Sequence, residues 1–222
     1  MCGIAGWFDK TNNLNKHQHI IDNMSLSLAN RGPDEDGIFM RKNLCLIHRR
    51  LSIIDIESGK QPMTKAYKGK ICTIVYNGEI YNSPEIMSEL RSKGFSFFGH
   101  SDTEVVLTAY LCWGTKCVEK LNGIFAFAIW DDDEQRLFLA RDRIGVKPLF
   151  YYEYKNGLLF ASEIKTLLKN PIVEPKIDEQ GLYEVFLLGP ARTSGFGVIK
   201  DIKELLPGEC ATYNGCLLYT SP

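Results

Sequence analysis

The segment Ile124-Phe125-Ala126-Phe127-Ala128-Ile129-Trp130 is apolar at every position, and it decides the fold class. In a strand, successive side chains point to opposite faces. The two phenylalanines and Ile129 would therefore lie on one face, and the two alanines and Trp130 on the other. A strand that is apolar on both faces must be packed between two layers. The sequence thus predicts a sheet that is covered on both sides.

Other segments predict hairpins and a few helices around this strand. Residues 136–140 would pair with it across the polar turn 131–135. Further strands are predicted at 2–8, 44–48, 71–76, 149–154, 158–162 and in a hairpin over 209–219 that turns at Asn214-Gly215. Helices are predicted at 17–29, 83–94, 101–113 and 178–188. Many hairpins with helices in two blocks indicate an α+β fold.

Two of these helices carry start signals. Ser83-Pro84-Glu85 has the order of an N-cap, a first-position proline and a first-turn acid, and Gly94 would end that helix. Ser101-Asp102-Thr103-Glu104 has the spacing of a capping box, in which Glu104 would reach back to the helix start.

Composition excludes several functional classes. The 222 residues fit one large domain, and a hydrophobic fraction of 45% can fill its core. Because 26 basic residues face 27 acidic ones, the chain lacks a basic surface for nucleic acid or an anionic membrane. Neither a membrane span nor a signal peptide is evident, so we expect a cytoplasmic protein.

Cysteine and histidine spacing argues against disulfides and metals. The seven cysteines are odd in number and contain no C-x-x-C pair, which indicates reduced thiols. His17-Gln18-His19 lacks a nearby third ligand, and Asp131–Glu134 is more typical of an acidic turn. Cys112 and Cys117 fit core thiols. We therefore predict no metal site.

Cys2 is the most reactive position in the sequence. Initiator methionine is normally removed before a small residue, and its loss would leave the Cys2 thiol beside a free α-amine. The thiol pKa is near 8.5 and the amine pKa near 7.7–8.0, so the amine can act as base for the thiol at neutral pH. The sequence thus predicts a nucleophile and its base on one residue.

Several ordered motifs accompany Cys2. They are Met1-Cys2-Gly3-Ile4-Ala5-Gly6, Arg31-Gly32-Pro33-Asp34, His48-Arg49-Arg50-Leu51-Ser52-Ile53-Ile54-Asp55, Asn77-Gly78-Glu79-Ile80-Tyr81-Asn82, Ser101-Asp102-Thr103-Glu104 and Gly145-Val146-Lys147-Pro148-Leu149. This set resembles the class II glutamine amidotransferases, which are N-terminal nucleophile (Ntn) hydrolases. Within that family, the Arg-Gly-Pro-Asp and His-Arg-Arg-Leu-Ser forms most resemble the glutaminase domain of glutamine-hydrolysing asparagine synthetase.

The resemblance implies a four-layer αββα sandwich over residues 1–215, with 216–222 as a truncated or divergent tail. It also implies L-glutamine as substrate and a synthetase domain as the acceptor of ammonia, and family members often form homodimers. The pyrophosphate-binding Ser-Gly-Gly-x-Asp-Ser loop of that synthetase domain does not occur here. ATP and Mg²⁺ would belong to the missing domain, so no cofactor is expected for this one.

The resemblance also implies site residues. Cys2 would attack the glutamine amide, and Asn77 with Gly78 would stabilise the oxyanion. Substrate would be held by Arg50 at its carboxylate, by Asp102 and Glu79 at its ammonium group, and by the chain at Leu51, Ser52, Ile53 and Ile54. Taken alone, Asn77-Gly78 would indicate a hairpin turn and Asp102 a first-turn helix acid, and the motif context favours the site roles. Arg49 is a weaker alternative to Arg50.

The implied activity is hydrolysis of L-glutamine to L-glutamate and ammonia through a Cys2 thioester, normally for ATP-dependent asparagine synthesis from aspartate. Alternatives are an inactive glutamine-binding module, an amidotransferase domain for another acceptor, and an Ntn amidase for another substrate. Arg31 and Asp34 would support the loop over the site, and Arg141-Asp142-Arg143 would form a structural ion-pair cluster. Neither His48 nor His100 is needed as a base.

Overall fold

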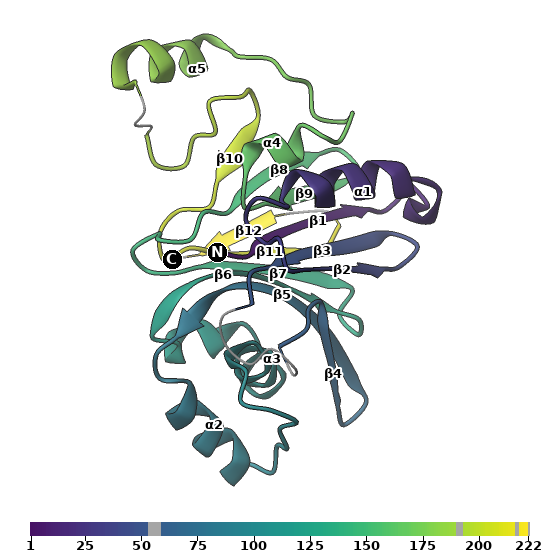
Figure 1. Ribbon diagram of the computed structural model, residues 1–222, viewed down its shortest axis with the longest axis vertical. Helices are drawn as coiled ribbons and strands as arrows, with labels where there is room; N and C mark the ends of the chain where they lie inside the picture. Colours follow the sequence, from purple (N-terminus) through teal and green to yellow (C-terminus); the bar gives the residue numbers. More distant parts are fainter. Residues whose placement is uncertain (53–58, 190–192, 216–217, 222) are drawn as a thin grey trace.

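Two six-stranded sheets stack face to face, and helices cover their outer faces (Figure 1). This computed structural model describes residues 1–52, 59–189, 193–215 and 218–221. All strand pairs within the two sheets are antiparallel. The architecture is the α+β sandwich of four layers, αββα, that was predicted.

The two sheets have separate strand orders. The first sheet contains, from edge to edge, β10 (Ile202–Glu204), β8 (Phe150–Tyr154), β9 (Gly157–Ala161), β1 (Gly3–Asp9), β3 (Leu44–Arg50) and β2 (Glu35–Met40). The second contains β12 (Leu218–Ser221), β11 (Cys210–Tyr213), β7 (Arg136–Arg141), β6 (Gly123–Asp131), β5 (Lys70–Ile80) and β4 (Met63–Tyr67). The chain start therefore lies in an inner strand of one sheet, and the strand that decided the fold lies inside the other.

Strand β6 joins two of the three hydrophobic cores. Phe125, Phe127 and Ile129 pack into the core beneath the helices of the second sheet. The two alanines and Trp130 face the core between the sheets. Fully burying a side chain such as Phe127, which is 0% exposed, stabilises the fold by about 1.5–3 kcal/mol. The two-faced burial predicted for this strand is confirmed.

The helices form the outer layers. Helix α1 (Gln18–Ser27) and the short α4 (Ile164–Leu167) cover the first sheet, and α2 (Ser83–Ser92) and α3 (Asp102–Trp113) cover the second (Figure 1). The remaining elements are the short η1 (Leu14–Lys16), η2 (Gly114–Lys120), α5 (Glu179–Tyr183) and η3 (Glu184–Leu188). None of the helices in the described ranges is long and apolar enough to cross a bilayer.

Both helix-start predictions need correction. Helix α2 has Asn82, not Ser83, at its N-cap, and the Asn82 side chain bonds to Lys120 and Asn122 instead of capping. At α3 the capping box is absent. Glu104 turns away to the buried ammonium of Lys65, 2.7 Å from its carboxylate, and to backbone N–H groups of the preceding loop. A buried charge needs a charged partner more than a helix end needs a cap, since leaving that charge unpaired is costly.

Candidate active site

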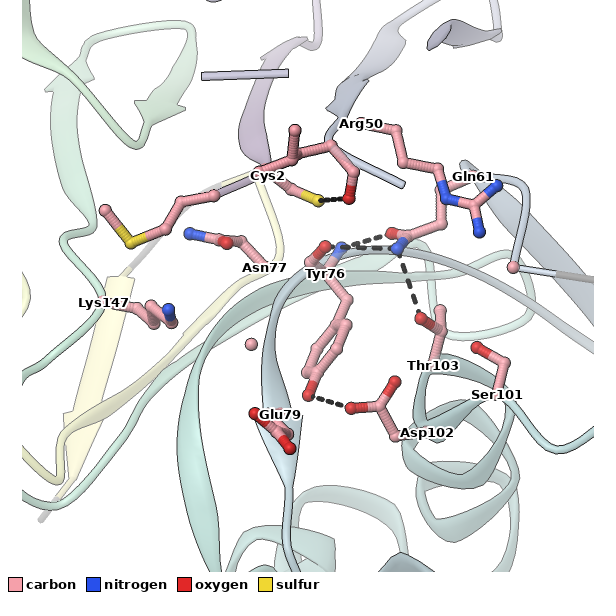
Figure 2. Close-up of a pocket in the computed structure, with 14 residues that line it drawn as sticks. Cys2, Arg50, Gln61, Tyr76, Asn77, Glu79, Ser101, Asp102, Thr103 and Lys147 are labelled. Atoms are coloured by element: carbon pink, nitrogen blue, oxygen red, sulfur yellow. Dashed lines mark hydrogen bonds between the residues drawn. The ribbon is translucent and has the colours of Figure 1, made fainter. Parts of the chain in front are cut away.

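A cavity of about 200 Å³ opens where the start of β1 meets the end of β5 (Figure 2). Most of the predicted site residues line it: Cys2, Arg50, Leu51, Asn77, Gly78, Glu79 and Asp102. Ser52 lies next to it in the chain but does not line it, and Ile53 and Ile54 lie outside the described residues. Residues far apart in sequence thus converge on one cleft at the ends of inner strands from the two sheets.

Cys2 is half-buried and directly precedes β1, and a hydrogen bond from Arg31 holds its backbone. Its thiol points to the carbonyl oxygen of Leu51, with 3.8 Å between Sγ and O. The Arg31 guanidinium donates to the Cys2 carbonyl at 3.0 Å, and Asp34 accepts the backbone N–H of Ser52 at 2.7 Å. As predicted, Arg31 and Asp34 support the chain around the cavity.

Burial disfavours the thiolate form of three other described cysteines. All six described cysteines are free thiols. Burial raises the pKa of Cys45 and of Cys72 to about 12, and it also raises the pKa of Cys117. The thiolate is the reactive form of cysteine. Among the described thiols, Cys2 is the one that lines this cavity.

Asn77 and Gly78 lie within strand β5, paired with Ala126 and Phe125 of β6. The hairpin-turn alternative for this dipeptide is therefore wrong. A Cβ atom on Gly78 would lie 2.4 Å from the carbonyl oxygen of Ile124, so the close approach of the two strands explains the glycine.

The Asn77 side chain is poised to donate. It is 2% exposed, and its Nδ2 has no hydrogen-bond partner among the described residues. A buried donor without a partner costs about 1–3 kcal/mol. An acceptor atom of a bound molecule in the cavity would remove that cost.

Asp102 begins helix α3 and faces the end of β5. Its Oδ2 accepts the hydroxyl of Tyr76 at 2.7 Å and the N–H of Ile80 at 3.1 Å. Burial raises the pKa of Asp102, as does the nearby Glu79 carboxylate, while these hydrogen bonds oppose the rise. A carboxylate that is costly to ionise in the empty cavity is stabilised when a cation binds beside it. Asp102 therefore does more than complement the helix dipole.

The two neighbouring arginines of β3 point in different directions. Arg50 is 5% exposed, lines the cavity and pairs with Glu35, with 2.9 Å between Nη1 and Oε2. Arg49 faces α1, where it donates to Ser25. This alternation is the normal consequence of strand geometry and supports the choice of Arg50.

The candidate bases and the acidic cluster remain apart from this site. His48 is buried, its ring contacts the Tyr76 carbonyl, and burial lowers its pKa to about 4. Neither His48 nor His100 lines the cavity. Asp131 and Asp132 pair with Lys70 and Arg41, both at 3.0 Å. In the described ranges, no group of three His, Cys, Asp or Glu residues could hold a metal ion.

The predicted ion-pair cluster at 141–143 is a backbone clamp. Arg141 pairs with Glu204 and donates to three carbonyl groups, and Arg143 donates to two others. Asp142 accepts backbone N–H groups of the loop that follows it. The residues have the predicted structural role, and Arg141 forms an ion pair, but most of their described contacts are with backbone groups. The loop that they hold carries Lys147 to the cavity.

Sequence reasoning gave no site role to Gln61, Tyr76, Ser101, Thr103 or Lys147, all of which line the cavity. Lys147 and Ser101 stood in quoted motifs, and Tyr76 directly precedes one. Gln61 had no such signal, because the strand that places it, β4, was not predicted.

Comparison with known proteins agrees with this geometry. Residues 1–217 match the family described as "Glutamine amidotransferase domain". The chain is 46% identical over 214 residues to "Asparagine synthetase [glutamine-hydrolyzing] 3" of Bacillus subtilis, covering 96% of this chain and 35% of that protein. It is 36% identical over 170 residues to "Asparagine synthetase B [glutamine-hydrolyzing]" of Escherichia coli, covering 76% and 30%. The chain therefore spans about a third of the length of these relatives.

A solved structure extends the likeness to the fold. The glutamine phosphoribosylpyrophosphate amidotransferase of B. subtilis, complexed with ADP and GMP, superposes with a TM-score of 0.68 at 17% identity, covering 99% of this chain and 49% of that one. At this identity the likeness concerns the fold alone.

Proposed function

Because the chain belongs to the glutamine amidotransferase domain family, we propose that it hydrolyses L-glutamine to L-glutamate and ammonia. The observation that carries the proposal is one cavity shared by the Cys2 thiol, the Asn77 amide and the Asp102 carboxylate, where Asn77 Nδ2 has no partner among the described residues. These are a nucleophile, a donor for a developing oxyanion and an acceptor for an ammonium group.

The nucleophile would be completed by removal of Met1. The freed α-amine of Cys2 takes the thiol proton, and Sγ attacks the side-chain amide carbon of glutamine. The amine returns that proton to the departing nitrogen as the C–N bond breaks, which releases ammonia and leaves a thioester. Water then adds to the thioester carbon, the C–S bond breaks, and glutamate leaves with the thiol restored.

Negative charge on the amide oxygen needs donors during both steps. Asn77 Nδ2 is the strongest candidate because it is buried and unpaired among the described residues. The backbone N–H of Gly78 is proposed as the second donor. Donors that are already oriented in a water-poor site stabilise the charge without reorganisation.

The cavity also fits the amino-acid end of glutamine. Arg50 is proposed to bind the α-carboxylate, because a guanidinium suits bidentate contact. Asp102, with Glu79 beside it, is proposed to bind the α-ammonium group. Leu51, which lines the cavity, is proposed to contact the substrate in the same slot. Ser52 does not line it, and contacts at Ile53 and Ile54 stay expectations from the sequence.

For the longer protein, we propose that the ammonia passes to a synthetase domain that makes asparagine from aspartate. The names of the relatives and their greater length support this. ATP and Mg²⁺ would act in that domain, and none is needed for glutamine hydrolysis. A homodimer and a cytoplasmic location are further parts of the proposal, and the free thiols of the six described cysteines support the location. A domain boundary at residue 215 with a tail at 216–222 also stays a proposal, but the pairing of β12 with β11 weighs against it.

Intact mass and glutamate release test the proposal together. We expect the purified chain to have lost one methionine and to release glutamate from glutamine, Cys2→Ala to release none, and Cys2→Ser to be far slower. A processed Cys2→Ala variant that still releases ammonia would refute the mechanism. Retention of Met1, which lines the cavity here, would instead favour a module that binds glutamine without cleaving it.

A further inference from the structure

Gln61 bridges two walls of the cavity through its side-chain amide (Figure 2). Its Oε1 accepts the backbone N–H of Tyr76 at 2.6 Å. Its Nε2 donates to the Tyr76 carbonyl and to Thr103 Oγ1, both at 3.2 Å. One side chain thereby binds the end of strand β5 and the start of helix α3.

The bridge replaces a missing strand pair. Strand β4 begins pairing with β5 at Met63 opposite Ile74, and the same register would set residue 61 opposite Tyr76. The side-chain amide of Gln61 binds both backbone groups of Tyr76 at that position, and the His48 ring contacts the same carbonyl. The backbone of Gln61 packs closely against Gly37 of strand β2. A Cβ atom on Gly37 would lie only 2.0 Å from the Gln61 carbonyl oxygen.

The two bridged residues each adjoin a proposed substrate contact. Tyr76 directly precedes Asn77, which is proposed to bind the amide oxygen. Thr103 directly follows Asp102, which is proposed to bind the α-ammonium group. A second link runs in parallel, since the Tyr76 hydroxyl also donates to Asp102. Hydrogen bonds from both sides therefore fix the separation between the two ends of the slot.

We propose that Gln61 is a positioning residue that sets the span between Asn77 and Asp102, and so makes the site select glutamine over asparagine. The two amino acids differ by one methylene between the ammonium-bearing carbon and the amide. A site can discriminate by about 10–200-fold on one methylene, provided that its ends are rigid. The inference rests on the proposed glutaminase activity.

Two variants of Gln61 test it. Gln61→Ala removes the bridge. Gln61→Glu keeps the side-chain shape but replaces the Nε2 donor by a carboxylate oxygen, which repels the Tyr76 carbonyl oxygen. We expect either change to lower kcat/KM for glutamine by about 10–100-fold, as a small misplacement of reacting groups does. The preference for glutamine is the ratio of the inhibition constant of asparagine to KM for glutamine. We expect this ratio to fall about tenfold in both variants.

The controls separate positioning from folding. Thr103→Val removes one acceptor of Gln61 while keeping the shape, and should move the preference in the same direction by less. Gln18→Ala, on the exposed side of α1 where Gln18 bonds to Asp22, should leave both constants unchanged.

A reduced melting temperature with an unchanged preference in both Gln61 variants would overturn the inference and leave Gln61 purely structural. If the wild-type chain itself releases no glutamate, the proposed function fails instead, so the two failures are distinguishable.

Discussion

Replacing Asn77 by alanine should separate activity from stability. Loss of one oxyanion donor lowers kcat by about 10²–10³. The same change should cost the fold little, because Asn77 Nδ2 makes no hydrogen bond in the described structure. Removing an unpaired buried polar group recovers about 1–3 kcal/mol of desolvation, which offsets the packing lost with the amide. We expect the unfolding free energy to stay within about 1 kcal/mol of wild type.

Asn82→Ala is the matched control. Asn82 lies just beyond β5, away from the cavity, and its side chain makes hydrogen bonds of 3.0 and 2.9 Å to Lys120 and Asn122. Its loss should destabilise the fold by about 0.5–1.5 kcal/mol while kcat is unchanged. Coupled detection of glutamate gives kcat, and urea unfolding gives the free energy. If Asn77→Ala destabilised the protein more than Asn82→Ala and kept its kcat, the oxyanion assignment would be refuted.

Three further predictions concern binding and pH. Arg50→Lys keeps the charge but loses the planar fork, so KM for glutamine should rise about tenfold while kcat changes less; an unchanged KM would move the carboxylate contact elsewhere. Asp102→Asn should raise KM for glutamine about tenfold or more without lowering the melting temperature at pH 7. The reason is that burial raises the pKa of Asp102, which makes its ionised form unfavourable in the folded state; a lower melting temperature would contradict this. Burial lowers the pKa of His48 from 6.5 to about 4 in the folded protein. Between pH 6.5 and pH 4 the unfolded chain therefore binds a proton at His48 and the folded chain does not, so the folded state loses stability as the pH falls. Urea unfolding at stepped pH should show wild type losing up to about 3 kcal/mol there relative to His48→Gln, and parallel pH profiles would exclude the effect.

Periodicity predicted the inner parts of the fold correctly. The alternation along β6 identified which residues face each core, because the pattern is set by strand geometry and by burial on both faces. The hairpins β6–β7 and β8–β9 and the helices α1 to α3 were also predicted within a few residues. These elements carry enough apolar residues for local sequence to define them.

Three of the four edge strands were missed for the opposite reason. Strands β2, β4 and β10 are short or have mixed exposure, and they lie at the edges of their sheets. Such segments become strands because a neighbour offers free backbone groups, which no local pattern records. Missing β4 hid the register that places residue 61 opposite Tyr76.

Tertiary pairing also overrode a strong local signal at Asn77-Gly78. The dipeptide favours a type I′ turn, but β5 runs on through it to Ile80 and pairs with β6 along its length. Because Asn77 lies on an inner strand, its side chain is buried, and its Nδ2 has no partner among the described residues. In an exposed turn, water would satisfy the same amide.

Two acids in the first turn of α3 illustrate what charge and position alone cannot decide. From charge and position, Asp102 and Glu104 are equivalent, since both complement the helix dipole. Glu104 binds Lys65 and the N–H groups of Phe98 and Gly99, so its oxygens are already committed within the protein. Asp102 accepts the Tyr76 hydroxyl and the Ile80 N–H on one oxygen, Oδ2, and lines the cavity. A substrate cation can bind to Asp102, because Asp102 faces the cavity while Glu104 is already paired with Lys65. We therefore expect Asp102→Asn to impair glutamine binding and a change at Glu104 to impair chiefly folding.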